Sequence, residues 1–405
     1  MRKVRLSKTA RPPKGKRSSG LPDDRIIPKS GTSGSTSWVW SWSAAVAVGF
    51  GIAASLGGLF LVYLALSLSE LDVHLLRVRT MVVRAVRQAA PVAAVVTRRP
   101  AVLAAPLHLG DTTVAVVVEN HVAARPPSGL ERAAVVYEAP AEGGITRFVA
   151  IFSLGNLPPV IGPVRSIRPY LVDWIEEWQA AVFHSGGSPE ALARLRGSSL
   201  VDFDEISWNG KYFWRDDARP RPHNLYTSSH LVVQAFVDYR LPTTTTFLPW
   251  EVVPDTTLHD RPPDGPAVRI VALDPQYCIA YRYEQSENRY QRWLAGVPHR
   301  SAEGMLLYAK GVVVQEVAGK VVDREGRLRL ATASGGWARI FSNGKIFPAT
   351  WQRQDGRTIF LRADGKPMGF PAGPVWVEIV LDHAAVEEPP AAGDPAAVFS
   401  LGCGG

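Results

Sequence analysis

The sequence contains little cysteine. Its 405 residues include two cysteines, Cys278 and Cys403. Two cysteines exclude a disulfide framework and a four-cysteine zinc site. Their pairing is left open, because Cys403 stands two residues from the C-terminus, where chains are commonly poorly ordered. Cysteine usage therefore does not decide the redox compartment.

An excess of positive charge is missing outside the first 37 residues. That tail carries ten of the 45 Lys and Arg residues and two of the 37 Asp and Glu residues, so it accounts for the whole formal charge of +8. The remaining 368 residues are neutral, with 35 bases and 35 acids. A neutral body gives no support to a nucleic-acid-binding surface, so nucleic acid is not an expected partner. A hydrophobic content of 46% excludes disorder of the whole chain.

Charged residues are absent between Lys29 and Glu70. The 32 residues from Trp38 to Ser69 would form a helix of roughly 48 Å, whereas the hydrocarbon core of a bilayer is about 30 Å thick. Ala44 to Leu66 is the predicted buried part. The apolar region of a secretory signal peptide has only about 7 to 15 residues, so an uncleaved signal anchor is the better interpretation.

The charges around this span give a mixed signal on orientation. Four arginines follow it closely, at positions 77, 79, 84 and 87, against two bases closely before it. The first span usually dominates, however, and long domains translocate largely regardless of charge. We therefore expect a single-pass protein of the cell membrane with a cytoplasmic N-terminus and extracytoplasmic domains. The span and the basic tail would contact membrane lipid.

The composition changes along the chain in a way that predicts an α+β fold with several segments. The N-terminal membrane-anchor helix is followed by a mixed α/β domain and then by a mainly β domain. The predicted boundaries are a basic tail at 1–37, a transmembrane helix at 38–69, a stalk at 70–109, the α/β domain at 110–245, a linker at 246–267, the β-rich domain at 268–386 and a flexible tail at 387–405.

The first of these domains alternates apolar runs with helical patterns. Strands are predicted at 114–118, 133–137, 147–152 and 180–183. A helix that begins near Pro169 would place Leu171, Trp174, Ile175 and Trp178 on one face, and Ser188 would cap a second helix. This alternation is typical of a sheet covered by helices.

The second domain contains three turn dipeptides between β-rich runs. They are Asn343-Gly344, Asp355-Gly356 and Asp364-Gly365. Such pairs supply the positive φ angles of tight hairpins, so they predict an all-β segment.

The first domain gathers polar residues near the ends of its predicted strands. In open α/β sheets the crevice beyond the strand ends is where ligands bind. The candidates for ligand binding are Glu119, Asn120, His121, Arg125, Glu138, Glu142, Arg147, Arg165, Arg168, His184, Ser185, Gly186, Gly187, Ser188, His223, Asn224 and Tyr226.

The stretch His184 to Glu190 indicates an anion site. A glycine-rich turn at a helix N-terminus presents backbone N–H groups that favour an anion. Arg147, Arg165 or Arg168 could add a fork for carboxylate or phosphate. Alternatively, the glycines only make the turn while the arginines pair with Glu138, Glu142 or Asp173.

Catalytic chemistry has weaker support. Neither Ser185 nor Ser188 sits in a G-x-S-x-G elbow. Glu138, Glu142 or His184 could serve as an acid or base, which keeps a hydrolase as the alternative. The spacing of His121, His184 and His223 is not that of a zinc helix, so no metal or cofactor is expected.

Long stretches of the chain resemble the YerB-like family of bacterial envelope proteins, whose domains are of unknown function. The stretches are ENHVAARPPSGLERAAVVYEAPAEGGITRFVAIF, IGPVRSIRPYLVDW, FHSGGSPEAL, FWRDDARPRPHNLYTS, YRYEQSENRYQRWLAGVPH and GKIFPATWQRQDGRTIFLRADGKPMGFPAGPVWVEI, spread over residues 119–379. The resemblance implies two domains outside the cytoplasm, and it transfers no catalytic residue. The family's founding members are tethered through a lipidated cysteine, whereas this chain has no cysteine before Cys278.

These observations predict a membrane-anchored extracytoplasmic protein, and they favour a binding protein over an enzyme. The expected ligand is an anionic or peptidic component of the cell envelope, or a partner protein of cell-wall synthesis. A spacer or scaffold without a ligand is a third possibility.

Overall fold

A computed structural model describes residues 111–241, 250–272, 274–381 and 385–388. The predicted tail, span and stalk at 1–109 lie outside these residues, as do most of the final segment and Cys403. Within the described residues no helix is long and apolar enough to cross a membrane.

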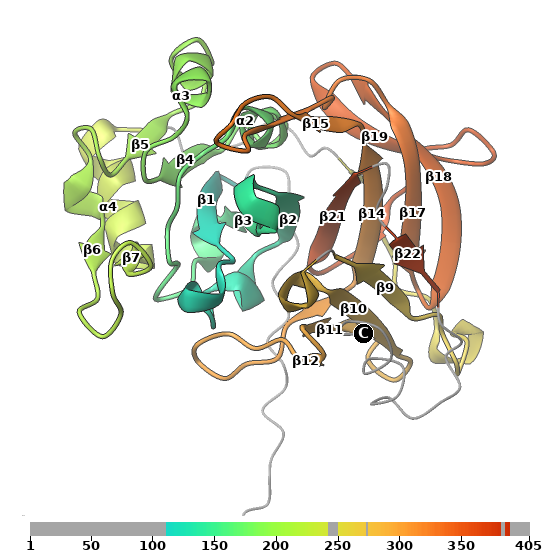
Figure 1. The fold of residues 1–405 in the computed structure, drawn as a ribbon. Coiled ribbons are helices and arrows are strands. Elements are labelled where there is room, and N and C mark those ends of the chain that lie inside the picture. Colours follow the sequence, from blue (N-terminus) through green and yellow to red (C-terminus); the bar gives the residue numbers. More distant parts are fainter. Residues whose placement is uncertain (1–110, 242–249, 273, 382–384, 389–405) are drawn as a thin grey trace, which may run out of the picture. The chain divides into compact units, whose positions relative to one another are not determined.

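One ten-stranded sheet organises the described part of the chain (Figure 1). Its strands, in spatial order, are β19 (Arg357–Arg362), β18 (Lys345–Gln354), β17 (Gly336–Ser342), β14 (Gly311–Val317), β21 (Val375–Leu381), β2 (Val135–Pro140), β3 (Thr146–Ser153), β1 (Thr113–Glu119), β4 (Ala181–His184) and β5 (Asp202–Asp204).

Smaller sheets complete the β structure. A six-stranded sheet contains β12 (Val297–Pro298), β11 (Arg289–Leu294), β10 (Ile279–Glu284), β9 (Val268–Val271) and β22 (Ala385–Glu387), with β13 (Tyr308–Ala309) paired to β11. Three two-stranded pairs are β15 (Gly319–Val321) with β16 (Leu328–Leu330), β20 (Phe370–Pro371) with β8 (Val252–Val253), and β6 (Trp214–Arg215) with β7 (Leu225–Tyr226).

The described α-helices all belong to the first half of the described chain. They are α2 (Pro169–Glu176), α3 (Pro189–Arg196) and α4 (Ser229–Tyr239), and short 3-10 helices lie between the strands: η1 (Val122–Ala124), η2 (Leu130–Arg132), η3 (Glu142–Gly144), η4 (Leu154–Asn156), η5 (Gly210–Tyr212), η6 (Leu258–Asp260) and η7 (Pro275–Tyr277). The α+β class is confirmed for the described residues, and the anchor helix lies outside them.

Local signals in the sequence placed most of these elements. The four strands and two helices predicted in the first domain are present, and the Ser188 side chain caps α3 by accepting from Ala191 N. The Asn343-Gly344 turn joins β17 to β18 with φ angles of 52° and 71°. Such angles suit a tight hairpin, which explains the glycine.

The two predicted domains contribute strands to the same sheet. β2 and β21 pair in parallel, from Val135 opposite Val375 to Glu138 opposite Glu378. Their boundary at 246–267 stays a prediction, but the pairing shows that residues about 240 positions apart are direct neighbours in the sheet.

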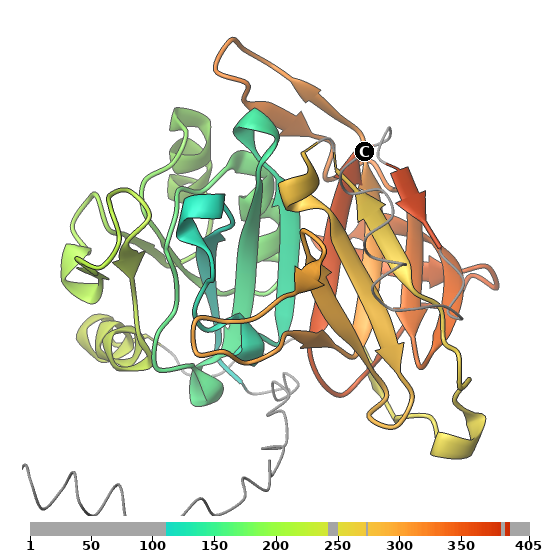
Figure 2. The ribbon, with the colours of Figure 1, turned by 60° about the horizontal axis from the view of Figure 1, so that its bottom comes forward.

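Apolar side chains of the central sheet alternate between two covered faces. Val114, Val116 and Val118 of β1 face a core shared with α4 and the six-stranded sheet, whereas Ala115 and Val117 face α2 and α3. Figure 2 shows β10 and β11 crossing over the central sheet. The alternation follows from the two-residue period of a strand.

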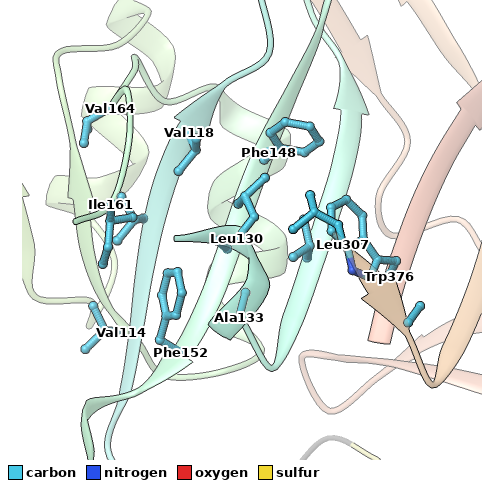
Figure 3. Packing of buried hydrophobic residues seen from close by; sticks show 14 of the residues in the cluster. Val114, Val118, Leu130, Ala133, Phe148, Phe152, Ile161, Val164, Leu307 and Trp376 are labelled. Atoms are coloured by element: carbon cyan, nitrogen blue, oxygen red, sulfur yellow. The ribbon is translucent and has the colours of Figure 1, made fainter. Parts of the chain in front are cut away.

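The first core joins residues from both halves of the described chain. Figure 3 shows Phe148 and Leu130 beside Leu307 and Trp376. The rings of Phe148 and Trp376 meet edge to face with centroids 5.9 Å apart. Burial of this apolar surface therefore binds the two halves together.

Candidate functional site

The parallel strands β1, β4 and β5 end at one edge of the central sheet, where the antiparallel strand β3 begins. Glu119, His184 and Asp204 are the last residues of the three parallel strands. Ligand sites of α/β sheets commonly form at such an edge. The sequence predicted that polar residues gather beyond these strand ends.

Glu119 is a buried carboxylate with two cationic or polar partners. Its Oε1 accepts from Arg165 Nε at 2.8 Å, and its Oε2 lies 3.0 Å from His223 Nδ1. The His223 ring stacks on His121 with centroids 4.7 Å apart. His121 Nδ1 in turn accepts from Ala123 N. Four of the predicted residues are thus brought together.

Arg147 is buried at the same edge without an ion pair. It lies opposite Glu119 in the β1–β3 register, but both oxygens of Glu119 are engaged elsewhere. Among the described residues its one hydrogen bond is from Nη1 to Ser166 O, at 3.0 Å, and its Nε is buried without an acceptor. Burial, and then the charge of Arg168, lower the pKa of Arg147 to about 10.

Arg168 holds Glu142 in a two-pronged ion pair. Arg168 Nε donates to Oε1 and Nη2 donates to Oε2 of Glu142. Although burial would raise the pKa of Glu142, its hydrogen bond with Arg168 lowers it. One of the alternative pairings expected from the sequence is therefore formed. Arg147, Arg165 and Arg168 are called the edge arginines below.

The glycine turn after β4 uses its N–H group within the chain. Gly186 N donates to Asp204 Oδ1 at 2.6 Å. A Cβ on Gly187 would approach Ile167, so this residue allows close packing. The sequence predicted that this turn binds an external anion. In the structure the Gly186 N–H binds the carboxylate of Asp204 instead, and the Ser188 side chain caps α3.

His184 is fully buried between oxygen atoms. Nδ1 lies 2.9 Å from Gly186 O, and Nε2 lies 2.7 Å from Asp202 Oδ1. Both ring nitrogens therefore contact oxygen atoms, and the ring joins the ends of β4 and β5.

A polar row continues along the edge past β4. Ser185 Oγ donates to Glu205 Oε2 at 2.8 Å, and Arg215 bridges Glu205 Oε1 and Asn224 Oδ1 at 3.0 and 3.2 Å. Ser185, Glu205, Arg215 and Asn224 are called the polar row. Its glutamate and arginine were not predicted as site residues.

The other predicted residues lie away from this row. Asn120 donates to Glu138 at 3.0 Å and accepts from Arg125 Nε at 3.0 Å, and the Arg125 guanidinium lies over the Tyr277 ring. Tyr226 stacks on Trp214. The sequence candidates therefore form an edge group and an interior group.

Glu138 of the interior group belongs to a buried ion network between the two large sheets. Arg292 of β11 donates to Glu138 through Nη2 and to Tyr281 OH at 3.0 Å through Nε. Tyr281 OH donates to Glu378, and Arg292 Nη1 lies 2.6 Å from His299 Nδ1. All five side chains are at most 5% exposed. They are called the ion network.

Burial sets the protonation states in this network. Burial, and then the charge of Glu138, raise the pKa of Glu378 to about 8. Burial and the charge of Arg292 lower the pKa of His299 well below its usual value. Burial and like charge thus favour the protonated form of Glu378, and Arg292 forms its close ion pair with Glu138.

Sequence reasoning missed four members of the ion network, although a signal was present. Glu378 interrupts the apolar strand VWVEIVL, and Arg292 is in phase with the inward-facing Tyr290 and Leu294. A charged residue at an inward strand position indicates a buried partner. His299 and Tyr281 carry no comparable local signal.

No group of three or more possible metal ligands occurs among the described residues. The expectation of no metal or cofactor remains a prediction.

Two family descriptions match the chain. Residues 103–240 match the N-terminal domain, and residues 268–377 the C-terminal domain, of "Protein of unknown function (DUF3048)". The chain is 32% identical over 283 residues to "Putative lipoprotein YerB" of Bacillus subtilis (strain 168), covering 68% of this chain and 83% of the relative.

A solved structure shares the fold. The crystal structure of YerB protein from Bacillus subtilis matches with a TM-score of 0.61 and 31% sequence identity, over 69% of this chain and 94% of that chain. The identity and the coverage together confirm the resemblance carried by residues 119–379. The chain therefore belongs to the YerB-like family, whose two domains are described as being of unknown function.

Proposed function

We propose that the described domains bind an anionic ligand of the cell envelope at the edge arginines, without turnover. The observation that carries this proposal is Arg147. A buried guanidinium costs free energy unless a partner compensates its charge, and none of the described residues supplies a carboxylate to it. A bound carboxylate or phosphate would fill that role.

The neighbouring charges favour the same ligand. Burial is the largest cause of the lowered pKa of Arg147; the charges of Arg168 and Arg165 lower this pKa further, while Tyr170 and the charge of Glu142 act in the opposite direction. The Arg165 side chain is 27% exposed, and its Nε alone is committed to Glu119. An anion can therefore approach from solvent at Arg165.

The hydrolase alternative receives less support from these contacts. Glu138 and His184 are at most 1% exposed, and the pKa of Glu142 is lowered beside Arg168. A general acid at neutral pH needs an accessible group with a raised pKa. Binding without turnover is thus the function that the site supports best.

Location outside the cell is part of the proposal. The relative YerB is named a lipoprotein, and such proteins are held at a membrane through lipid. This chain has no cysteine before Cys278, so we propose the segment 38–69 as its tether. Protease treatment of intact cells should digest the domains, and their protection would contradict this topology.

The binding test uses the full-length chain in phosphatidylcholine nanodiscs, titrated calorimetrically with soluble muropeptides and with poly(glycerol phosphate). We expect one of them to bind, and Arg147→Met to weaken binding at least tenfold. Arg282→Met is the matched control, because Arg282 is exposed on β10.

Two results would contradict the proposal. One is the absence of binding by either probe; the other is equal binding to the wild type and to Arg147→Met. Release of fragments from envelope material, seen by mass spectrometry and lost in Glu142→Gln, would favour the hydrolase instead. Capture of a protein partner that is insensitive to all these substitutions would favour a scaffold.

A further inference from the structure

Two apolar side chains extend the edge beyond the polar row. Ile206 is 69% exposed and Trp208 is 89% exposed, and both lie in the loop between β5 and η5. Single exposed apolar residues are common on proteins, but an almost fully exposed tryptophan next to an exposed isoleucine is unusual. Ile206 and Trp208 are called the apolar pair.

The backbone of this loop is held in place around the apolar pair. Asp204 accepts from Ile206 N at 3.1 Å and from Ser207 Oγ at 3.0 Å. The buried Asn209 donates to Asp202 O and accepts from Tyr239 OH at 2.7 Å. The loop therefore presents the two side chains to solvent from a fixed backbone, which lowers the entropic cost of binding there.

The turn after β4 links Ile206 to the edge arginines. Ser185 N donates to Arg165 O at 3.1 Å, and Ser185 Oγ donates to Glu205 Oε2 at 2.8 Å. The position of a Cβ on Gly186 lies against Ile206 Cδ1. Arg147 lies at the start of β3, Ser185 follows β4 and Ile206 follows β5, and these strands lie in the order β3, β1, β4, β5 seen in Figure 1.

This order sets the length and chemistry of the ligand. Three strand spacings of about 4.8 Å give roughly 14 Å between the β3 and β5 ends, which exceeds the size of a small anion. The arginine end suits a carboxylate, the mixed donors and acceptors of the polar row suit hydroxyl and amide groups, and a flat indole suits the apolar face of a sugar ring.

We propose that the ligand is a carboxylate-bearing glycan, with its acid group at the edge arginines and a sugar ring against Trp208. This inference rests on the proposed function, since it names the substrate class of the same site. An acidic peptide is less favoured, because the polar row carries both signs of charge. The apolar pair also does not require a ligand that pairs with a strand, as an extended peptide would.

The test compares four probes on the full-length chain in phosphatidylcholine nanodiscs. They are N-acetylmuramic acid, a tetrasaccharide that alternates N-acetylglucosamine with N-acetylmuramic acid, the neutral N-acetylglucosamine tetrasaccharide, and a tetraglutamate peptide. We expect the acidic tetrasaccharide to bind most tightly. Trp208→Ala should weaken it about tenfold while leaving the affinity for N-acetylmuramic acid unchanged.

Val237→Ala is the matched control, because it removes another exposed apolar side chain, on α4. If an anionic probe binds through Arg147 but Trp208→Ala has no effect, or if tetraglutamate binds more tightly than the acidic tetrasaccharide, the glycan is wrong and anion binding stands. If the neutral tetrasaccharide binds as tightly as the acidic one, the carboxylate is not recognised and the glycan is wrong. If none of these anionic probes binds, and neither muropeptides nor poly(glycerol phosphate) binds, both proposals fail.

Discussion

Arg292 and Arg147 are both buried, but their surroundings differ. Arg292 is 0% exposed and meets Glu138, Tyr281 and His299 with its donors, over the ring of Trp376. Arg147 is 4% exposed and has one backbone acceptor. Opposing charges raise the pKa of Arg292 despite its burial, whereas burial and like charge lower that of Arg147.

This difference in partners distinguishes a structural arginine, Arg292, from one that we propose binds a ligand, Arg147. An arginine whose donors are all satisfied holds two sheets in register, and its removal leaves a carboxylate unpaired. An arginine that lacks a partner lowers stability, so its retention needs another explanation. We therefore expect substitutions at the two positions to have opposite effects on folding.

The largest effect should come from Arg292→Met. This change leaves the buried Glu138 without its ion-pair partner, with Asn120 and Thr146 as its remaining donors. The free energy of unfolding should fall by about 3–5 kcal/mol, measured by denaturant titration of the full-length chain. A loss below about 1 kcal/mol would show that the ion network does not hold the sheets together.

A double substitution sharpens this prediction. Replacing Glu138 by Gln in the Arg292→Met background removes the carboxyl group that lost its ion-pair partner, so it should recover part of the loss. Arg282→Met, at an exposed position of β10, should change the free energy by less than about 0.5 kcal/mol.

Two buried glutamates, Glu378 of the ion network and Glu177 at the end of α2, should also make stability depend on pH. Burial raises the pKa of Glu378 to about 8 and that of Glu177 to about 7, from 4.5 in the unfolded chain. Both folded pKa values are raised, so this stability is fully present below pH 4.5 and is lost as the pH rises through 7 and 8. The expected slope is up to about 1.4 kcal/mol per pH unit for each group.

Unfolding measurements between pH 5 and pH 9 check this slope. In Glu378→Gln the decrease with rising pH should be smaller, because one titrating group is gone. Stability that rises from pH 6 to pH 8 in the wild type would contradict the protonation states given for the ion network.

Arg147→Met should have a smaller effect of the opposite sign. It removes a buried charge without a counterion, so the free energy of unfolding should rise by about 1–2 kcal/mol in the absence of ligand. Thermal unfolding of the wild type and the variant measures this directly. A destabilised variant would mean that Arg147 is structural, like Arg292, and would weaken the proposed anion site.

Trp208→Ala should have the smallest effect on folding. Its side chain is 89% exposed, so the free energy of unfolding should change by less than about 0.5 kcal/mol. A loss of binding to the acidic tetrasaccharide would then reflect the ligand contact alone. A large loss of stability would show that the indole packs against the protein.

Elements with strong local signals were predictable. The strand period near Val114, the Ser188 cap and the Asn343-Gly344 turn each depend on residues a few positions apart, and each was predicted correctly. The rule that polar residues gather beyond strand ends named Glu119, Arg165 and His223 as candidates but not their contact with one another, which the structure shows.

The ion network and the polar row were not predictable in the same way. Glu138 meets Arg292 across 154 positions, and Glu378 becomes its neighbour through the β2–β21 pairing. Nothing in the residues next to Glu138 specifies which distant strand will pair with β2. Glu205 and Arg215 likewise become recognisable as site residues only through their contacts with Ser185 and Asn224.

By itself the sequence determined the α+β class of the described residues, the turns, the caps and the family, because these depend on local periodicity and on long matching stretches. Only the tertiary structure decided which arginine is paired and which is not. Charge compensation depends on distances between side chains from remote strands, and the ten-stranded sheet sets those distances by joining the two halves of the described chain.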